Sequence, residues 1–185
     1  MITDFIGSTP LIKLNYFSEI SGCNIYGKAE FMNPGGSIKD RAAKYIIEHA
    51  MKTGLIKSGG TIVEGTAGNT GIGLALVGNA FGLKTIIVIP ETQTDEKKLT
   101  LRACGAELIE VPAVPYIDKN NYVKYSKKVA MKQSNKNGVL WANQFDNTVN
   151  FEGHLNDTGP EILKNLDNLV DGFVCACGTG GTLTG

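Results

Sequence analysis

The stretch TIVEGTAGNTGIGLALVGNA, residues 61–80, places a short strand-like run, a glycine-rich turn and a helical pattern in direct succession. The run at 61–64 is rich in β-branched residues, which is typical of a buried strand in a parallel sheet. After Gly71, Ile72 and Ala75 recur at helical spacing within a stretch that is apolar nearly all round. The sequence therefore predicts a strand that leads through a tight turn into a buried helix.

The same alternation continues along the rest of the chain. One helix is marked by Thr94 as an N-cap and by Gly105 as a stop. Another is expected to be interrupted at Gly159-Pro160, because proline lacks the amide that a helix interior needs. Strands that alternate with helices predict an α/β fold with a doubly wound parallel sheet. Further strands are expected at 84–90, 106–111, 138–143 and 172–176, and further helices at 94–105, 121–133 and 149–166.

The overall composition argues against several classes of function. Of 185 residues, 42% are hydrophobic, and 18 basic residues balance 18 acidic ones. Such a chain has no global field that steers it to nucleic acid or to an anionic membrane, so a small neutral or zwitterionic partner is expected. Its apolar runs are too short to span a bilayer, and its start, MITDFIGSTPLIKL, lacks the features of a signal peptide. A cytoplasmic location is expected.

The cysteines and histidines do not form a metal-binding pattern. Cys23, Cys104, Cys175 and Cys177 show no CxxC spacing, and the two histidines lie far apart. No metal site is therefore predicted. Buried free thiols in a reducing compartment are the favoured interpretation.

The segment NPGGSIKDR, residues 33–41, opens a helical pattern that carries a lysine of interest. Ser37 with Asp40 three residues later resembles a capping box, so the helix is expected to begin at Ser37. Lys39 lies four residues before Ala43 of the apolar stripe, which puts Lys39 on the core face. A snorkelling lysine is the ordinary explanation. Burial and the helix dipole both lower the pKa of a lysine there, however, and a neutral amine can form a Schiff base with a carbonyl compound.

Two glycine-rich turns are candidate anion sites. EGTAGNTG, residues 64–71, leads from a strand into a helix, so its backbone N–H groups can bind a carboxylate or a phosphate. Thr66, Asn69 and Thr70 add side-chain donors. A plain turn is the alternative, and the glycine order does not match the GxGxxG pattern of dinucleotide sites. CGTGGT, residues 177–182, suits a phosphate in the same way.

Gln144 is a candidate for ligand binding because of its place in the pattern. It follows the run LWAN, at the carboxyl edge where ligands bind in sheets of this kind. An amide that is satisfied within a loop is equally compatible with this position.

Four motifs in order, NPGGSIKDR, EGTAGNTGIGLA, NQFDN and GTGGT, resemble those of the fold-type II pyridoxal-phosphate enzymes. The resemblance is to the cysteine synthase and cystathionine β-synthase group, and it covers essentially all 185 residues. It implies two domains, a smaller one at 36–147 and a larger one built from 1–35 and 148–185. Members of the group run to on the order of 300 residues. The second domain is therefore expected to be incomplete in this chain, and the isolated fragment to be inactive.

The resemblance also assigns expected roles to single residues. Lys39 would hold pyridoxal 5'-phosphate as a Schiff base, and Asn69 would bond the ring hydroxyl of that cofactor. Arg41 would turn outward with Asp40 as its partner, so that no lone cation is buried. The substrate carboxylate would be gripped by Thr66, Gly68, Asn69 and Thr70 with Gln144 closing on it, and the cofactor phosphate by Gly178, Thr179, Gly180, Gly181 and Thr182.

By the same resemblance, the expected reaction is the replacement of the acetate of O-acetylserine by sulfide, which forms cysteine. The cofactor acts as an electron sink, and the freed Lys39 takes the α-proton. Cystathionine β-synthase, which joins serine and homocysteine, is the first alternative, and a catalytically silent binding module is the second. Ala67 stands where many relatives have Ser. Ile38 and Thr70 differ from the residues typical of serine and threonine dehydratases.

The partners implied by the resemblance are an amino acid, sulfide and a second copy of the chain. A homodimer is expected, and serine acetyltransferase is a possible further partner because some relatives bind it.

Overall fold

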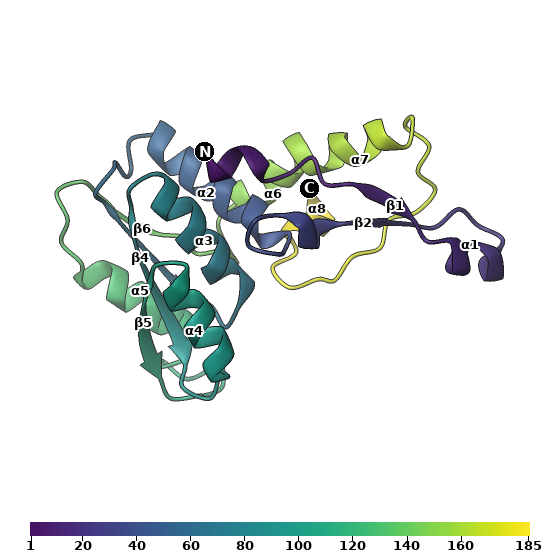
Figure 1. Cartoon of the computed structure of the whole chain (residues 1–185). Coiled ribbons are helices and arrows are strands. Elements are labelled where there is room, and N and C mark those ends of the chain that lie inside the picture. The colour runs from purple at the N-terminus through teal and green to yellow at the C-terminus, as the bar shows by residue number, and fades with distance from the viewer.

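The four strands expected between residues 61 and 143 form one parallel sheet in the computed structural model, which describes residues 1–185 (Figure 1). The strand order is β5-β4-β3-β6, and every neighbouring pair is parallel. This confirms the α/β class. The strands are β3 (Thr61–Gly65), β4 (Lys84–Pro90), β5 (Ala106–Val111) and β6 (Val139–Trp141).

Helices cover both faces of this sheet, because successive strand residues point to opposite sides. On one face, Val63 and Val88 pack against Val129 of helix α5 (Tyr122–Lys132). On the other face, Ile62 packs against the helices α2 (Lys39–Lys52) and α3 (Asn69–Ala80), and Ile87 packs against α3 and α4 (Asp95–Ala103). The doubly wound arrangement is therefore confirmed for this sheet.

The start and the end of α4 agree with the local signals. The hydroxyl of Thr94 accepts a hydrogen bond from the amide of Lys97 at 3.5 Å, as an N-cap does. The chain leaves the helix at Gly105, whose φ of +92° lies in the left-handed region that favours glycine.

The start of α2 differs from the expectation. The helix begins at Lys39, two residues later than Ser37, and the Ser37 hydroxyl accepts a bond from the Lys39 amide at 3.2 Å. The carboxylate of Asp40 reaches back to the amide of Gly35 and not to that of Ser37. The capping box is therefore wrong, because the turn that precedes the helix offers Asp40 another donor.

The first 32 residues form an arm beside the sheet (Figure 1). Strands β1 (Leu11–Lys13) and β2 (Tyr26–Lys28) pair antiparallel, and α1 (Asn15–Ser21) connects them. Short 3₁₀ turns at Ile2–Phe5 and Glu30–Met32 flank this pair. Sequence patterns did not predict these elements.

The segment 149–165 stays helical through the expected interruption. It runs as α6 (Val149–Gly153), a π-helical segment (His154–Thr158) and α7 (Gly159–Asn165). Pro160 lies in the first turn of α7, where its missing amide is tolerated. The preceding π turn widens the hydrogen-bonding pattern where the proline could not have donated.

The strand expected at 172–176 is wrong. These residues have no regular structure, and most of them are exposed. An extended segment becomes a strand only beside a neighbour that supplies hydrogen bonds, and this segment pairs with neither sheet of the chain. The chain then turns into a short helix, α8 (Gly181–Thr184).

The expectation of buried thiols is also partly wrong. All four cysteines are free, but Cys23 and Cys177 are exposed, and Cys104 and Cys175 are half-buried. No group of three or more His, Cys, Asp or Glu side chains is arranged to hold a metal ion. No helix combines the length and the apolar character needed to cross a bilayer.

Candidate functional site

The carboxyl edge of the sheet brings Thr70 and Gln144 together. Strands β3 and β6 are parallel neighbours, so the segments that follow them leave the sheet at the same edge. Asn143 has a φ of +48°, a left-handed conformation that asparagine tolerates, and it turns the chain just before Gln144. The buried Gln144 Oε1 accepts a hydrogen bond from Thr70 Oγ1 at 2.6 Å, and Gln144 Nε2 donates to Glu64 Oε1 at 3.2 Å.

Asn150 of α6 connects this edge to the second glycine-rich turn. Its Nδ2 donates to the main-chain oxygen of Gln144 at 3.0 Å and to Thr179 Oγ1 at 2.9 Å. Gly181 packs so closely on Asn150 that an added Cβ would lie 2.6 Å from its Oδ1. A side chain at position 181 would therefore push the turn away. A pocket of about 160 Å³ opens at this junction.

Lys39 lies at the first residue of α2, close to the start of α3. An added Cβ at Gly73 of α3 would lie 3.0 Å from the main-chain oxygen of Lys39, so glycine permits this contact between the helices. Lys39 is half-buried, and burial lowers the pKa of its amine, although the Cys175 side chain opposes this shift. The expected direction of the pKa shift is therefore confirmed.

His154 of the π-helical segment contacts the second glycine-rich turn. Burial, together with the positive charges of Lys39 and Arg41, lowers the pKa of His154 to about 4. Its Nδ1 lies 2.9 Å from Thr158 Oγ1, and its Nε2 lies 3.4 Å from Thr182 Oγ1. The imidazole is therefore neutral at physiological pH.

The turn at 178–182 presents main-chain donors without partners in the chain. The amides of Gly178, Thr179 and Gly180 make no hydrogen bond, and the space beside the Cα atoms of Gly178 and Gly180 is open. Gly180 has a φ of +84°, which favours glycine. Successive free amides of this kind form a concave site for an anion such as a phosphate.

The turn at 66–70 also presents main-chain amides without hydrogen-bond partners. The amides of Ala67, Asn69 and Thr70 make no hydrogen bond, whereas the amide of Gly68 donates to Thr66 Oγ1 at 3.3 Å. These free amides lie at the N-terminus of the twelve-residue helix α3, whose dipole favours a negative charge. The side chain of Asn69 is exposed, so it is accessible to a ligand.

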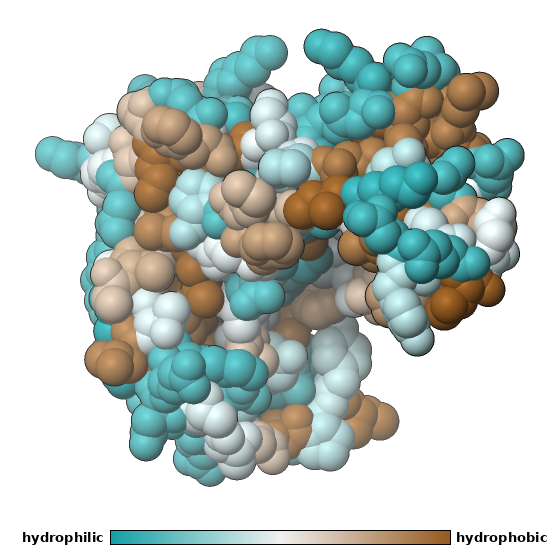
Figure 2. All heavy atoms as spheres, turned by 45° about the vertical axis from the view of Figure 1, so that its right-hand side comes forward, coloured by the Kyte–Doolittle hydropathy of each residue, from teal (hydrophilic) through white to brown (hydrophobic).

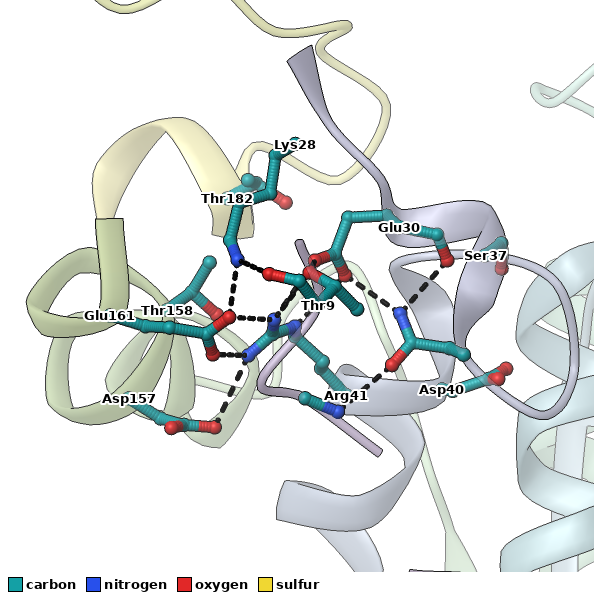
Figure 3. Close-up of polar contacts among 12 residues, drawn as sticks. Thr9, Lys28, Glu30, Ser37, Asp40, Arg41, Asp157, Thr158, Glu161 and Thr182 are labelled. Atoms are coloured by element: carbon teal, nitrogen blue, oxygen red, sulfur yellow. Dashed lines mark hydrogen bonds and ion pairs between the residues drawn. The ribbon is translucent and has the colours of Figure 1, made fainter. Parts of the chain in front are cut away.

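The structure corrects the expectation for Arg41. Its side chain is fully buried, and its guanidinium lies between the carboxylates of Glu30 and Glu161 (Figure 3). It donates two hydrogen bonds to each of them, at distances from 2.8 to 3.1 Å. Asp40 is not its partner. The two-carboxylate pocket forms only when the arm and α7 pack on α2, and for that reason a sequence pattern does not show it.

The cations Arg41 and Lys28 stabilise the ionised form of Glu161. Burial alone would raise the pKa of Glu161, but hydrogen bonds from Arg41 and from Lys28 of β2 lower it to about 2. Glu161 also accepts a bond from the Ser8 amide at 3.0 Å. This cluster joins the arm, α2 and α7 through Arg41, which lies two residues after Lys39 in the first turn of α2.

Three residues of the site were missed by the sequence patterns, namely Glu64, Asn150 and His154. A signal was present for two of them, because Asn150, His154 and Thr158 recur every four residues and so share one helical face. Glu64 lies at the end of an apolar run, where a carboxyl group has no distinguishing pattern.

Glu64 is expected to make the protein less stable as the pH rises. Burial raises its pKa from 4.5 to about 7, more than the nearby amides of Asn143 and Gln144 lower it. The folded state thus holds a proton between these pH values that the unfolded state has lost, so the free energy of unfolding falls by up to about 3 kcal/mol across this range. His154 has the opposite effect on stability. Its pKa is lowered to about 4, so between about pH 4 and 6.5 the unfolded state holds a proton that the folded state has lost, and the free energy of unfolding rises with pH.

The measurement is the urea midpoint of the whole protein at pH 5 and pH 8. Glu64→Gln is expected to gain stability relative to the wild type at pH 8 and to gain none at pH 5. The matched control is Glu48→Gln on the surface of α2, which is expected to change neither midpoint. An equal effect of Glu64→Gln at both pH values would contradict the prediction.

The family model and the similar curated proteins point to the same class of enzyme. The family model of the pyridoxal-phosphate dependent enzymes matches residues 2–185. The chain is 52% identical over 184 residues to cysteine synthase 1 of Neurospora crassa, covering 100% of this chain and 48% of that protein. It is 43% identical over 185 residues to a cysteine synthase of Staphylococcus aureus, covering 100% of this chain and 58% of that protein.

Solved structures give a consistent result. An O-ureido-L-serine synthase superposes with a TM-score of 0.88 at 38% identity, covering 98% of this chain and 56% of that one. The chain therefore spans about half the length of the curated relatives and of the solved structure that it matches.

Proposed function

This chain belongs to the pyridoxal-phosphate dependent enzymes, and we propose that the protein replaces the acetate group of O-acetylserine with sulfide to form cysteine and acetate. The observation that carries this proposal is the identity of 43–52% to cysteine synthases along the whole chain. The arrangement of the carboxyl edge of the sheet, with one lowered-pKa amine and two anion-binding turns, supports it.

The residues present fit pyridoxal 5'-phosphate. The free amides and open glycine positions of 178–182 suit its phosphate, and the half-buried amine of Lys39, whose pKa is lowered by burial, suits its aldehyde. The exposed Asn69 is the proposed partner of the ring hydroxyl. When bound, the cofactor supplies an electron sink for the charge that develops at the α-carbon of the substrate.

Lys39 is proposed to move the α-proton. A general base works best when its pKa lies near the working pH, and burial shifts the pKa of Lys39 in that direction. The Nζ atom is held by α2, whose first turn is fixed by the Arg41 cluster, so the amine is supported by a rigid element.

The turn at 66–70 is proposed to bind the substrate carboxylate. The free amides of Ala67, Asn69 and Thr70 and the dipole of α3 supply the attraction. Thr66, Gly68 and Gln144 complete the site. Because these donors are main-chain groups, Ala67 in place of the Ser of many relatives removes no amide.

The substrate pair is tested by kinetics. We expect the whole protein to turn over O-acetylserine and sulfide with a kcat/KM at least about 100-fold above that for serine and homocysteine, since the active site discriminates through transition-state binding. The measurement is the formation of cysteine and of cystathionine under identical conditions. If only serine and homocysteine reacted, cystathionine β-synthase would replace the proposed activity.

The proposed assembly is a homodimer, and serine acetyltransferase is a proposed further partner. Large hydrophobic side chains are exposed on the arm, among them Tyr16, Phe17 and Ile20 of α1 and Phe31, which suits a protein interface. Figure 2 turns the side of the molecule with this arm forward and shows hydrophobic residues in several places on its surface.

The four free cysteines suit the cytoplasm, the proposed location. The domain division at 36–147 stays a prediction.

A further inference from the structure

Gln144 is the centre of a buried hydrogen-bonded chain that joins the two anion-binding turns. Its side-chain oxygen accepts from Thr70, its side-chain nitrogen donates to Glu64, and its main-chain oxygen accepts from Asn150. Asn150 also donates to Thr179. The side chains of Thr70 and Thr179 thus belong to one network, although 109 residues separate them in the sequence.

Glu64 determines which way the Gln144 amide faces. Glu64 Oε1 accepts from the Gln144 nitrogen whether the carboxyl group is ionised or carries its proton on the unpartnered Oε2, and the Gln144 oxygen then faces Thr70. Glu64 is 1% exposed, and its Oε2 has no hydrogen-bond partner. A buried carboxyl group with an unsatisfied oxygen opposes folding, and its one side-chain hydrogen bond is the bond to Gln144. We therefore interpret Glu64 as the acceptor that orients the Gln144 amide.

Asn150 holds the turn that carries Gln144. It is 4% exposed, and its single Nδ2 group satisfies two acceptors from different parts of the chain. The left-handed conformation of Asn143 needs such support from the surrounding structure. Loss of the Asn150 amide would release the turn and the Thr179 hydroxyl together.

We propose that Glu64 and Asn150 are positioning residues that act through Gln144. Glu64 fixes the amide toward Thr70 in the proposed carboxylate turn, and Asn150 fixes the Gln144 main chain to Thr179 in the proposed phosphate turn. Neither residue needs to contact the substrate. The inference rests on the proposed function for the identity of the two ligands.

The first measurement is the dissociation constant of L-serine for the cofactor-loaded whole protein, obtained from the change in cofactor absorbance. Serine carries the carboxylate but has a poorer leaving group than O-acetylserine. Glu64→Met, which removes the acceptor, and Asn150→Ala are each expected to weaken serine binding about tenfold. Glu64→Gln keeps an oxygen acceptor at this position and is expected to restore binding to within about threefold of the wild type.

The second measurement needs no cofactor. Inorganic phosphate is expected to raise the melting temperature of the cofactor-free whole protein, and Asn150→Ala is expected to raise the phosphate concentration needed for this effect about tenfold. The matched control is Asn156→Ala in the same helical segment. Asn156 is exposed and donates only to the main-chain oxygen of Glu152, so neither measurement should change.

A double-mutant cycle separates positioning from mere support of the fold. In a Gln144→Ala background, Glu64→Met and Asn150→Ala are expected to cause no further loss of serine binding. The effect of Asn150→Ala on phosphate is expected to persist there, because Asn150 contacts Thr179 directly. Equal losses of serine binding in both backgrounds would overturn the proposal, as would unchanged serine binding in Glu64→Met.

Failure of the proposed function gives a different result. In that case the wild-type protein would show no absorbance change with serine, and the phosphate measurement on Asn150→Ala would decide the inference alone. If Glu64→Met did not fold, the cycle with Asn150→Ala would test the same chain of contacts.

Discussion

Lys39→Ala is expected to lower the turnover of O-acetylserine and sulfide by roughly 10³-fold or more, because it removes both the proposed base and the amine that holds the cofactor. The amine is half-buried, and burial lowers its pKa. Mixing the wild-type protein with pyridoxal phosphate should give visible absorbance that borohydride fixes onto Lys39, as shown by mass spectrometry of the modified peptide.

The control for this experiment lies on the same helix. Lys52 is exposed in the last turn of α2, and Lys52→Ala should leave both absorbance and turnover unchanged. If the wild-type protein developed no absorbance, or if borohydride modified another lysine, the assignment of Lys39 would be wrong. A protein without absorbance would favour the catalytically silent binding module.

Arg41→Met is expected to destabilise the protein by about 3–5 kcal/mol, which is the usual effect of removing one partner from a buried ion pair. The substitution leaves the carboxylates of Glu30 and Glu161 facing each other with much less compensation, since only Lys28 still pairs with Glu161. It also disconnects the arm and α7 from α2. The measurement is the urea midpoint of the whole protein at pH 7.

Arg102→Met provides the matched comparison. Arg102 also pairs with a carboxylate, Glu110, but about half of its side chain is exposed, so a change below about 1 kcal/mol is expected. Arg41→Lys should lie between the two, because an ammonium keeps the charge but cannot make paired hydrogen bonds to two carboxylates. A loss below about 1 kcal/mol in Arg41→Met would show that the cluster does not hold these elements together.

The sequence by itself determined the sheet and the helices that cover it. Strands β3, β4, β5 and β6 and the helices α3, α4 and α5 were all predicted near their observed bounds. Each is specified by residues close in sequence, through β-branched runs, helical spacing and the Thr94 cap. The partial burial of Lys39 agrees with its spacing to Ala43, whereas the direction of its side chain stays a prediction.

Only the tertiary structure decided the polar contacts that surround the proposed site. Arg41 pairs with Glu161, which lies 120 residues away, and Glu64 reaches Gln144 across 80 residues. The segment 172–176 has strand-like composition but no partner strand beside it. Helical and strand periodicity describe neighbours within a few residues, whereas a buried charge or an amide is positioned by groups that only folding brings near. For that reason the sequence predicted the elements and the candidate residues, and the structure alone showed how Glu64, Asn150 and Arg41 hold them in place.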